Sequence, residues 1–370
     1  MTELRELCNF IHSNPESGFA EFKAVGIQKK FLEERGFSVT FPYGSALQTA
    51  FHAEYGADNA PTVIFMSEYD ALEGLGHGCG HNLIATAALQ AFLQTAEAIR
   101  QTKINAKAIL LGTPAEEGMG GKAYLIEKHA FDNAGLALIS HPYHLDGIGP
   151  SSMGIAHLQV EFFGKSAHAS MAPEHGINAL DAMISLFNSV ALYRQQMPKS
   201  CQIHGIITDG GKAANIIPDY TKALFYTRSF IAKEHHQIDE DFKRMVHGAA
   251  MSTGCNCKLG NSSPRYDASI TYPELEKAML AEMLKAGLKN EKIDRRLSSD
   301  FGNVSQLLPT VNIFFAVSET GEPQLHTIEF REAAGTVFAF NQAVKAGNAM
   351  AQTALRFMTE PDFRQAVKLK

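Results

Sequence analysis

The segment from Thr62 to Arg100 reads TVIFMSEYDALEGLGHGCGHNLIATAALQAFLQTAEAIR. It begins with a short β-branched run, Thr62–Met66, and ends with a run from Asn82 to Arg100 whose apolar residues recur at helical spacing. A strand, a polar loop and a helix in this order are the building unit of a mostly parallel α/β sheet. Ligands of such sheets bind beyond the carboxyl ends of the strands. The polar loop is therefore the first candidate for a functional site.

The turn His77-Gly-Cys-Gly-His-Asn82 combines a thiol and imidazoles, which borderline divalent metals prefer. Its glycines let the backbone turn tightly enough to direct Cys79 and His81 at one point. Taken alone, Cys79 is more often a small buried hydrophobe, and it is also a possible covalent nucleophile. The second metal-binding side chain in the same turn favours a ligand. We expect His77 to be structural and Asn82 to cap the following helix.

Strand-like and helix-like segments alternate on both sides of this turn, which predicts a doubly wound, mostly parallel sheet. The predicted helices are Glu21–Arg35, Asn82–Arg100, Gly121–Lys128, Tyr272–Ala286 and about Thr336 to Met358. The predicted strands are Thr62–Met66, Ala108–Gly112, Leu136–Ser140 and Val311–Val317.

A stretch of different character interrupts this pattern. Leu158–Phe162 alternates apolar and polar residues, as a strand with one wet face does. The further elements predicted here are helices Asn178–Gln196 and Ile238–Ser252 and strands Gln202–Ile207 and Lys222–Arg228. Half-exposed strands in a β-α-β-β-α order indicate an α+β domain of ferredoxin-like type. We therefore expect an inserted domain at 155–265 and a discontinuous main domain at 1–154 and 266–370.

Composition excludes several classes of function. A hydrophobic content of 45%, a charged content of 19% and a net charge of −6 describe a globular protein without a basic patch, so nucleic acid is not an expected partner. No apolar run is long enough to span a bilayer, and the first residues lack the apolar core of a secretory signal. Five scattered cysteines do not form a disulfide framework, so we expect a cytoplasmic protein.

Polar clusters follow the other predicted strands of the main domain. Glu116 and Glu117 follow one strand, His141 follows the next, and His326 lies in the loop after the last. If these strands are parallel neighbours, one thiolate, three imidazoles and a carboxylate meet at one edge, too many for a single tetrahedral ion. Two metals sharing a bridging group fit this set, and a thiolate can bridge. The non-functional alternatives are that Glu116 and Glu117 are acids at a helix start, where they interact favourably with the helix dipole, and that His326 is a solvated loop residue.

Adjacent glutamates suit such a centre. One carboxylate can coordinate a metal while its unligated neighbour accepts a proton from water that the metal acidifies. Asp70, next to the Cys/His turn, could orient an imidazole.

These residues resemble a known family, the M20 metallopeptidases, in particular their amidohydrolase branch with aminobenzoyl-glutamate hydrolase-like members. Within it they are most similar to the M20 domain-containing 2 group, which resembles dipeptidases acting on dipeptides with a basic C-terminal residue. The matching motifs follow in the family's order along nearly the whole chain. They begin at Glu68 (EYDAL), Gly76 (GHGCGHN), Gly112 (GTPAEEG), Ser140 (SHPY), Gly164 (GKSAHAS), Ala214 (ANIIP), Ser299 (SDFGNV) and Leu325 (LH).

The resemblance implies a role for each matched residue. The implied metal ligands are Cys79, His81, Glu117, His141 and His326, which would hold two divalent ions such as Zn, Mn, Co or Ni. Glu116 would be the general base and Asp70 the residue that orients a ligand. Residues 155–265 would be a lid or dimerisation domain, from which His168, Asn215 and Arg228 would approach the substrate's carbonyl or carboxylate. The chain departs from the commoner pattern at Asn82, where Asp is usual, and at Gly78, where Ala is usual.

We therefore expect a metal-dependent hydrolase of small N-acyl amino acids or dipeptides that forms a homodimer through the inserted domain. The alternative is a metal-holding or small-molecule-binding protein on the same scaffold that does not hydrolyse its ligand. A hydrolase that uses Cys79 as a covalent nucleophile ranks a distant third.

Overall fold

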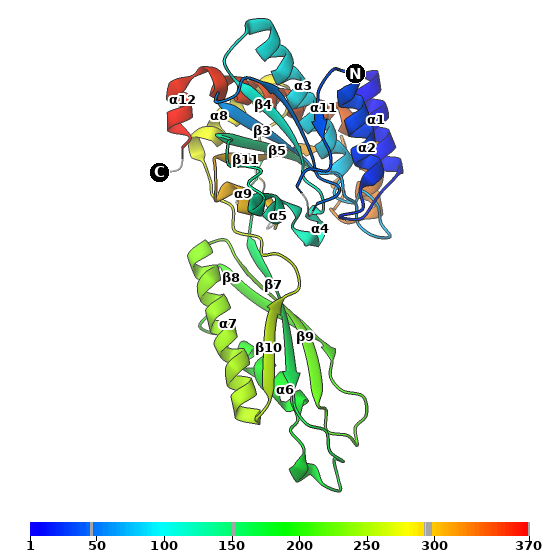
Figure 1. Ribbon diagram of the computed structural model, residues 1–370, viewed down its shortest axis with the longest axis vertical. Helices are drawn as coiled ribbons and strands as arrows, with labels where there is room; N and C mark the ends of the chain where they lie inside the picture. Colours follow the sequence, from blue (N-terminus) through cyan, green and yellow to red (C-terminus); the bar gives the residue numbers. More distant parts are fainter. Residues whose placement is uncertain (45–46, 150–151, 292, 294–297, 369–370) are drawn as a thin grey trace. The chain divides into compact units, whose positions relative to one another are not determined.

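The computed structural model describes residues 1–44, 47–149, 152–291, 293 and 298–368, and all statements below refer to these residues. The chain divides into two compact units (Figure 1). Unit 1 comprises residues 1–151, 270–296 and 303–370, and unit 2 comprises residues 152–269 and 297–302. Each unit has its own hydrophobic core, as the chain length predicts.

A seven-stranded sheet organises the described part of unit 1, in the order β1-β2-β4-β3-β5-β11-β6. Its strands are β1 (Val39–Thr40), β2 (Phe51–Gly56), β3 (Thr62–Ser67), β4 (Lys107–Gly112), β5 (Leu136–Tyr143), β6 (Gly147–Ile148) and β11 (Thr310–Ala316). The four central strands, β4, β3, β5 and β11, are parallel neighbours, whereas the edge pairs are antiparallel. The mostly parallel α/β class predicted from the sequence is confirmed.

Two long helices, α3 (His81–Thr102) and α11 (Val337–Thr359), pack against each other and on β3 and β5. Small residues line α3, where Ala85, Ala88 and Ala91 are buried, and they allow close packing on the sheet. The other described helices of unit 1 are α1 (Thr2–Ser13), α2 (Phe22–Glu33), α4 (Glu116–Met119), α5 (Gly121–Glu127), α8 (Pro273–Lys285), α10 (Ile328–Ala334) and α12 (Pro361–Ala366). The short helix α9 (Phe301–Ser305) begins in the last two residues of unit 2 and ends in unit 1. None of the described helices is both long enough and apolar enough to cross a membrane.

Unit 2 is a four-stranded antiparallel sheet in the order β10-β7-β9-β8, with two helices against it. The strands are β7 (Gly154–Phe163), β8 (Cys201–Asp209), β9 (Tyr220–Ser229) and β10 (Asn256–Asn261); the helices are α6 (Ala179–Tyr193) and α7 (Ala232–Thr253), with a short 3-10 turn at Pro173–His175. Burial alternates residue by residue along β9, so one face of the sheet meets the helices. The β-α-β-β-α-β order is that of the predicted ferredoxin-like type.

Candidate metal centre

The site lies where the parallel strands of unit 1 end. Because β4, β3, β5 and β11 run in the same direction, their carboxyl ends lie along one edge of the sheet. Glu68 and Asp70 follow β3, and Glu116 begins the short helix after β4. His141 lies on β5 itself, which continues three residues beyond its predicted end at Ser140. The convergence predicted from the sequence is therefore present in the fold.

The Cys/His turn depends on a glycine at position 80. Gly80 adopts a φ of 66°, and a Cβ there would lie 2.6 Å from Cγ of Pro142. Only glycine, which has no Cβ, adopts this left-handed φ and avoids the contact with Pro142 without strain. The helix α3 then begins at His81, with Gly80 as its N-cap residue. The turn thus delivers the imidazole of His81 directly from the first residue of the helix.

The prediction that Asn82 caps this helix is wrong. Because the helix begins one residue earlier, Asn82 lies inside its first turn. Its fully buried amide donates instead to the carbonyl oxygen of Ala334, at 3.0 Å, and to Sγ of Cys8, at 3.3 Å. Asn82 therefore ties α3 to α10 and α1, a role that the donor amide of Asn can fill and a carboxylate cannot.

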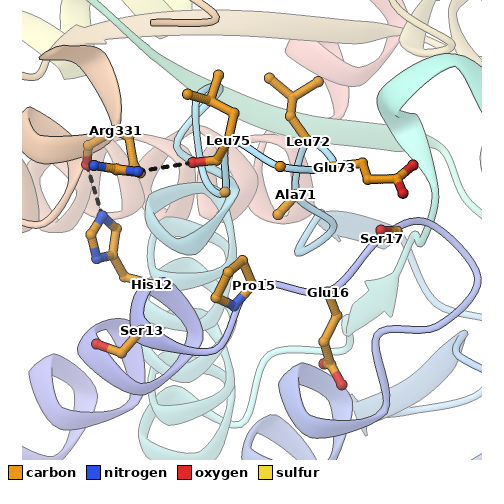
Figure 2. Close-up of a pocket in the computed structure, with 12 residues that line it drawn as sticks. His12, Ser13, Pro15, Glu16, Ser17, Ala71, Leu72, Glu73, Leu75 and Arg331 are labelled. Carbon is orange, nitrogen blue, oxygen red and sulfur yellow. Dashed lines mark hydrogen bonds between the residues drawn. The ribbon is translucent and has the colours of Figure 1, made fainter. Parts of the chain in front are cut away.

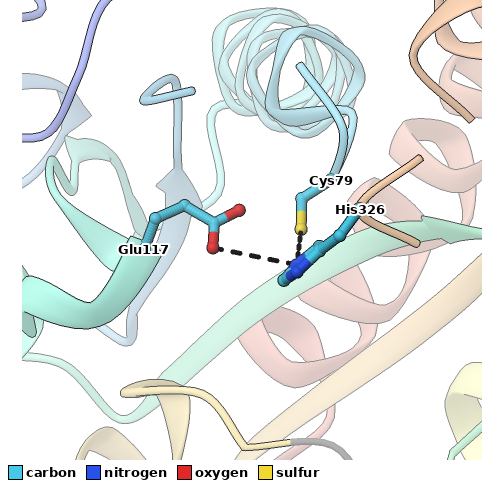
Figure 3. Close-up of side chains that lie close together, drawn as sticks. All are labelled: Cys79, Glu117 and His326. Atoms are coloured by element: carbon cyan, nitrogen blue, oxygen red, sulfur yellow. Dashed lines mark hydrogen bonds and ion pairs between the residues drawn. The ribbon is translucent and has the colours of Figure 1, made fainter. Parts of the chain in front are cut away.

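Cys79, Glu117 and His326 form the first group of side chains that could hold a metal ion (Figure 3). Nε2 of His326 lies 2.8 Å from Sγ of Cys79 and 3.9 Å from Oε2 of Glu117. The backbone of His326 is left-handed, with a φ of 64°, and its N–H donates to the carbonyl of Gly78 at 3.0 Å. A residue that is 247 positions away in the sequence is thus fixed on the Cys/His turn.

A second group forms around His81, which is almost fully buried. Its Nδ1 lies 2.9 Å from Oδ1 of Asp70, so Nε2 is the nitrogen that remains for a metal. That Nε2 lies 3.8 Å from Oε1 of Glu117 and 4.0 Å from Oε2 of Glu116. The other oxygen of Asp70 accepts the backbone N–H of Glu117 at 2.9 Å. Asp70 therefore orients both a histidine and the acidic pair, as carboxylates behind metal-binding histidines do.

His141 joins the cluster through residues that the sequence interpretation did not include in the site. Nδ1 of His141 contacts Oδ1 of Asn312 on β11 at 2.9 Å, and its Nε2 lies 3.3 Å from Oε2 of Glu68. The other oxygen of Glu68 accepts a 2.6 Å hydrogen bond from Nζ of Lys122, and both side chains are fully buried. The signals were present in the sequence: Asn312 interrupts a very apolar strand, and Lys122 lies on an otherwise apolar helix face.

The electrostatics of the site fit divalent cations. Burial raises the pKa of the Cys79 thiol well above its ordinary value, so the thiolate form requires a cation beside the sulfur. Burial alone would lower the pKa of His81, but the Asp70 carboxylate raises it. Two buried oxygens, Oε2 of Glu68 and Oε1 of Glu117, have no hydrogen-bond partner among the described residues. Thiol, imidazole and carboxylate donors with unused lone pairs are a suitable set for Zn, Mn, Co or Ni.

A cavity of about 510 Å³ lies beside the Cys/His turn (Figure 2). It is lined by residues 12–13, 15–17 and 71–76 and by Arg331. The guanidinium of Arg331 donates to the carbonyl of Leu75 at 3.3 Å, and the carbonyl of Arg331 lies 2.7 Å from Nε2 of His12. The first bond links α10, which follows His326, to the loop before Cys79, and the second links α10 to α1. Because α10 follows His326 and the loop precedes Cys79, these bonds help to hold Cys79 and His326 in place.

The three remaining predicted residues lie in unit 2, at two ends of its sheet. The segment of His168 pairs with Ile216, and the N–H of Ala169 donates to the carbonyl of Asn215 at 3.0 Å. This loop cluster lies past the Tyr220 end of β9, whereas Arg228 is at the opposite end of β9, paired with Ile155 on β7. At about 3.3 Å per residue, the eight steps between the two ends amount to about 26 Å. His168 and Arg228 of one chain are therefore far apart.

The imidazole of His168 has a defined tautomer. Its Nδ1 accepts the backbone N–H groups of Ser170, at 3.3 Å, and Met171, at 3.2 Å. Nε2 consequently carries the proton in the neutral ring and is a hydrogen-bond donor. Arg228 donates from Nε to Nε2 of His204 at 3.2 Å and from its guanidinium to Oγ of Ser298 at 3.1 Å.

Comparisons with known proteins agree with this picture. Residues 151–251 match the model of a peptidase dimerisation domain of the M20 family. The chain is 32% identical to the human Xaa-Arg dipeptidase, over 99% of this chain and 88% of the relative. It is 29% identical to one of the subunits of the p-aminobenzoyl-glutamate hydrolase of Escherichia coli, over 74% of this chain and 60% of the relative. A dinuclear metal-binding peptidase of the M20 family from Bacillus subtilis has the same fold, with a TM-score of 0.68 and 18% identity over 94% of this chain and 97% of that structure.

The chain belongs to the M20 family of peptidases and amide hydrolases, because its identity to the human relative extends over nearly its whole length. It is therefore an enzyme, and the family resemblance predicted from the motifs is confirmed.

Proposed function

We propose that this enzyme hydrolyses the amide bond of dipeptides or small N-acyl amino acids with the help of two divalent metal ions. The observation that supports this most is the convergence of five metal-binding side chains and one further acid at a single sheet edge. The names of the relatives, a dipeptidase and an aminobenzoyl-glutamate hydrolase, support the same bond type.

Cys79, His81, Glu117, His141 and His326 would hold the ions. Cys79 and Glu117 lie between the other donors, which suits them to contact both ions. When bound, the ions would polarise the scissile carbonyl and acidify a water molecule. Asp70 would keep Nε2 of His81 directed at the ions by occupying its Nδ1.

Glu116 would act as the general base. The carboxylate of Glu116 is buried beside the proposed ligands, 4.0 Å from Nε2 of His81. Asp70 fixes the backbone of the adjacent residue, Glu117. A carboxylate in this place can accept a proton from the attacking water and deliver it to the leaving amine. Such transfers contribute about 10²–10⁴-fold to a rate.

Residues of unit 2 would complete the site. The donor Nε2 of His168 suits a developing oxyanion, while Arg228 and Asn215 suit the free carboxylate of the substrate. A dipeptide extends over only about 7 Å, so His168 and Arg228 of one chain cannot both contact it across about 26 Å. We therefore propose that residues 155–265 also form a homodimer, in which one of the two comes from the partner.

The substrate class that we favour is a dipeptide with a basic C-terminal residue. The human relative is named for this activity and is similar over nearly the whole chain. N-acyl amino acids and aminobenzoyl-glutamate are the next candidates. A cytoplasmic location is consistent with five cysteines that are all free.

A substrate panel tests the proposal. Purified protein is incubated with Xaa-Arg and Xaa-Lys dipeptides, neutral dipeptides, N-acyl amino acids and aminobenzoyl-glutamate, with and without chelator. We expect cleavage of the basic dipeptides that chelator abolishes and added Mn²⁺, Zn²⁺ or Co²⁺ restores. The variant Glu116→Gln should lose about 10²–10⁴-fold in turnover and retain its metal. Metal binding without cleavage of any compound would favour the non-hydrolytic alternative.

A further inference from the structure

We propose that Glu68 is a sixth protein ligand of the metal centre, held in place by Lys122. This inference rests on the proposed two-metal function and adds a residue to the site. Glu68 is fully buried, and so are Lys122 and the imidazole of His81 that it faces.

The two oxygens of Glu68 have different surroundings. Oε1 accepts a 2.6 Å hydrogen bond from the ammonium of Lys122. Oε2 lies 3.3 Å from Nε2 of His141 and 3.6 Å from Nε2 of His81, yet it is buried without a well-directed hydrogen bond. A buried carboxylate oxygen without a partner is costly, so its presence calls for an explanation.

The two nitrogens near Oε2, Nε2 of His141 and Nε2 of His81, are also the ones that would bind the metal ions. Nδ1 of His81 is occupied by Asp70, and Nδ1 of His141 by Asn312, so each ring has only Nε2 left for coordination. Oε2 of Glu68 is therefore directed at the same space as both metal-binding nitrogens.

The distances match those between two ligands of one ion. Metal–nitrogen and metal–oxygen bonds of about 2.1 Å place two ligand atoms about 3.0 Å apart in octahedral and about 3.4 Å apart in tetrahedral geometry. The separations of Glu68 from His141 and His81, 3.3 and 3.6 Å, are close to this range.

A purely structural role of Glu68, as the partner of Lys122 in a buried ion pair, would leave its Oε2 without an explanation. Buried ion pairs are stabilising only when their remaining polar atoms are satisfied. Lys122 satisfies Oε1, and a metal ion would satisfy Oε2. With Glu68 the centre would have six protein ligands for two ions. If Cys79 and Glu117 each contact both ions, these ligands supply eight contacts, about four for each ion, and octahedral ions would keep positions for water and substrate.

Titration of the metal-free enzyme with Co²⁺, followed by calorimetry and visible absorption, tests this inference. Wild type should bind two ions per chain. Glu68→Gln, which retains an acceptor for Lys122, should bind one ion tightly and the second at least 10-fold more weakly. The matched control Glu73→Gln changes an exposed carboxylate on the same loop and should bind like wild type.

A double variant keeps the test valid if the single variant folds poorly. Glu68→Gln with Lys122→Met removes both buried charges and should restore folding, with the second ion still weakened. Unchanged binding of two ions by this folded double variant, or by Glu68→Gln, would overturn the inference and leave the proposed function intact. If wild type itself binds no Co²⁺, the proposed function fails as well.

Discussion

Two adjacent glutamates differ in their surroundings at the scale of single residues. Glu117 has its backbone held by Asp70 and lies between His81 and His326. Oε2 of Glu116 lies 4.0 Å from Nε2 of His81. In the proposed centre, the two glutamates of this dipeptide would have different roles, with Glu117 as a ligand and Glu116 as the unligated acid. The sequence predicted this division of roles, which remains a proposal.

Asp70 provides a prediction at this scale. Asp70→Asn keeps the shape of the side chain but removes the charge behind His81 and replaces an acceptor of the Glu117 N–H. We expect metal affinity to fall about 10–100-fold, measured by competition with a metal indicator. The control is Asp132→Asn, which alters an exposed Asp132–His129 pair that is not part of the candidate site. Equal affinities of the two variants would contradict the role of Asp70.

At the scale of secondary-structure elements, the turn before α3 brings Cys79 and His81 together. We expect this turn to be the element most sensitive to substitution. Gly80→Ala combines a left-handed backbone with a Cβ 2.6 Å from Pro142. Gly74→Ala, on the preceding loop, has a similar φ of 74° but open space around its Cβ. We expect a loss of about 1 kcal/mol for Gly74→Ala from the backbone alone and a clearly larger loss for Gly80→Ala.

Urea unfolding measures these free energies, and Co²⁺ titration measures the effect on the site. Gly80→Ala should also weaken metal binding, because Cys79 and His81 flank it, whereas Gly74→Ala should not. Equal losses of stability in both variants would show that the packing against Pro142 does not matter.

The elements themselves were largely predictable. Helices α3, α6, α8 and α11 and the four parallel strands have strong apolar periods, and their predicted positions are confirmed within a few residues. Helix α7 begins at Ala232, six residues before the predicted start, because its first turns are polar and charged. The prediction omitted α1, β2 and β10. Helix α1 was missed although its buried residues Leu4, Leu7 and Ile11 have helical spacing, whereas β10 is a short, largely polar edge strand that carries little periodic signal.

The site was predictable as a set of residues but not as a set of contacts. Motif spacing placed the ligands at strand ends, and parallel topology brings those ends together. No local pattern indicates that Glu68 pairs with Lys122 or that Asn312 reaches His141. The first contact depends on where α5 lies relative to the end of β3, and the second depends on the register between β5 and β11. Asn82 shows the same limit: its partners lie 74 and 252 residues away.

Unit 2 contains a pH-sensitive element. His235 on α7 is fully buried, and burial followed by the charge of Arg265 lowers its pKa to about 4. Its ring contacts the carbonyl of Thr227 at 3.0 Å, and Asp239 and His236 are its other charged or titratable neighbours. Because the unfolded chain binds this proton near pH 6.5 and the folded chain does not, stability falls as the pH decreases from about 6.5 to about 4.

We expect this loss to be on the order of 2–3 kcal/mol in wild type. Urea unfolding monitored at pH 7.5 and pH 4.5 should show a smaller loss in His235→Gln, which cannot take up the proton. A matching control is His236→Gln, which changes the neighbouring exposed histidine. The same loss in all three proteins would show that His235 does not carry the effect.

At the scale of the whole molecule, His168 and Arg228 lie far apart within unit 2. The roles that we propose for them would therefore require cooperation between two chains. Strand β8 supports such an assembly. It pairs only with β9 among the described strands and exposes Ile206 and Ile207 at 63% and 42%. An exposed edge strand with apolar side chains is a ready surface for pairing with a second copy.

Mixing two inactive variants tests this cooperation. Glu116→Gln lacks the proposed base, and His168→Ala lacks the proposed oxyanion donor, so each homodimer should be nearly inactive. If His168 acts on the partner's site, each mixed dimer regains one intact site, and equal mixing should restore about a quarter of wild-type turnover. No restoration, with subunit exchange verified by mass spectrometry, would show that His168 acts within its own chain.

The central claim is that distant loops of unit 1 enclose two cations beside an unligated acid. Anomalous diffraction from crystals grown with Mn²⁺ tests it most directly. We predict two peaks about 3.5–4 Å apart, with Cys79 and Glu117 in contact with both and Glu116 in contact with neither. Peaks elsewhere, or a single peak at full occupancy that excludes His141 or His326, would contradict the account.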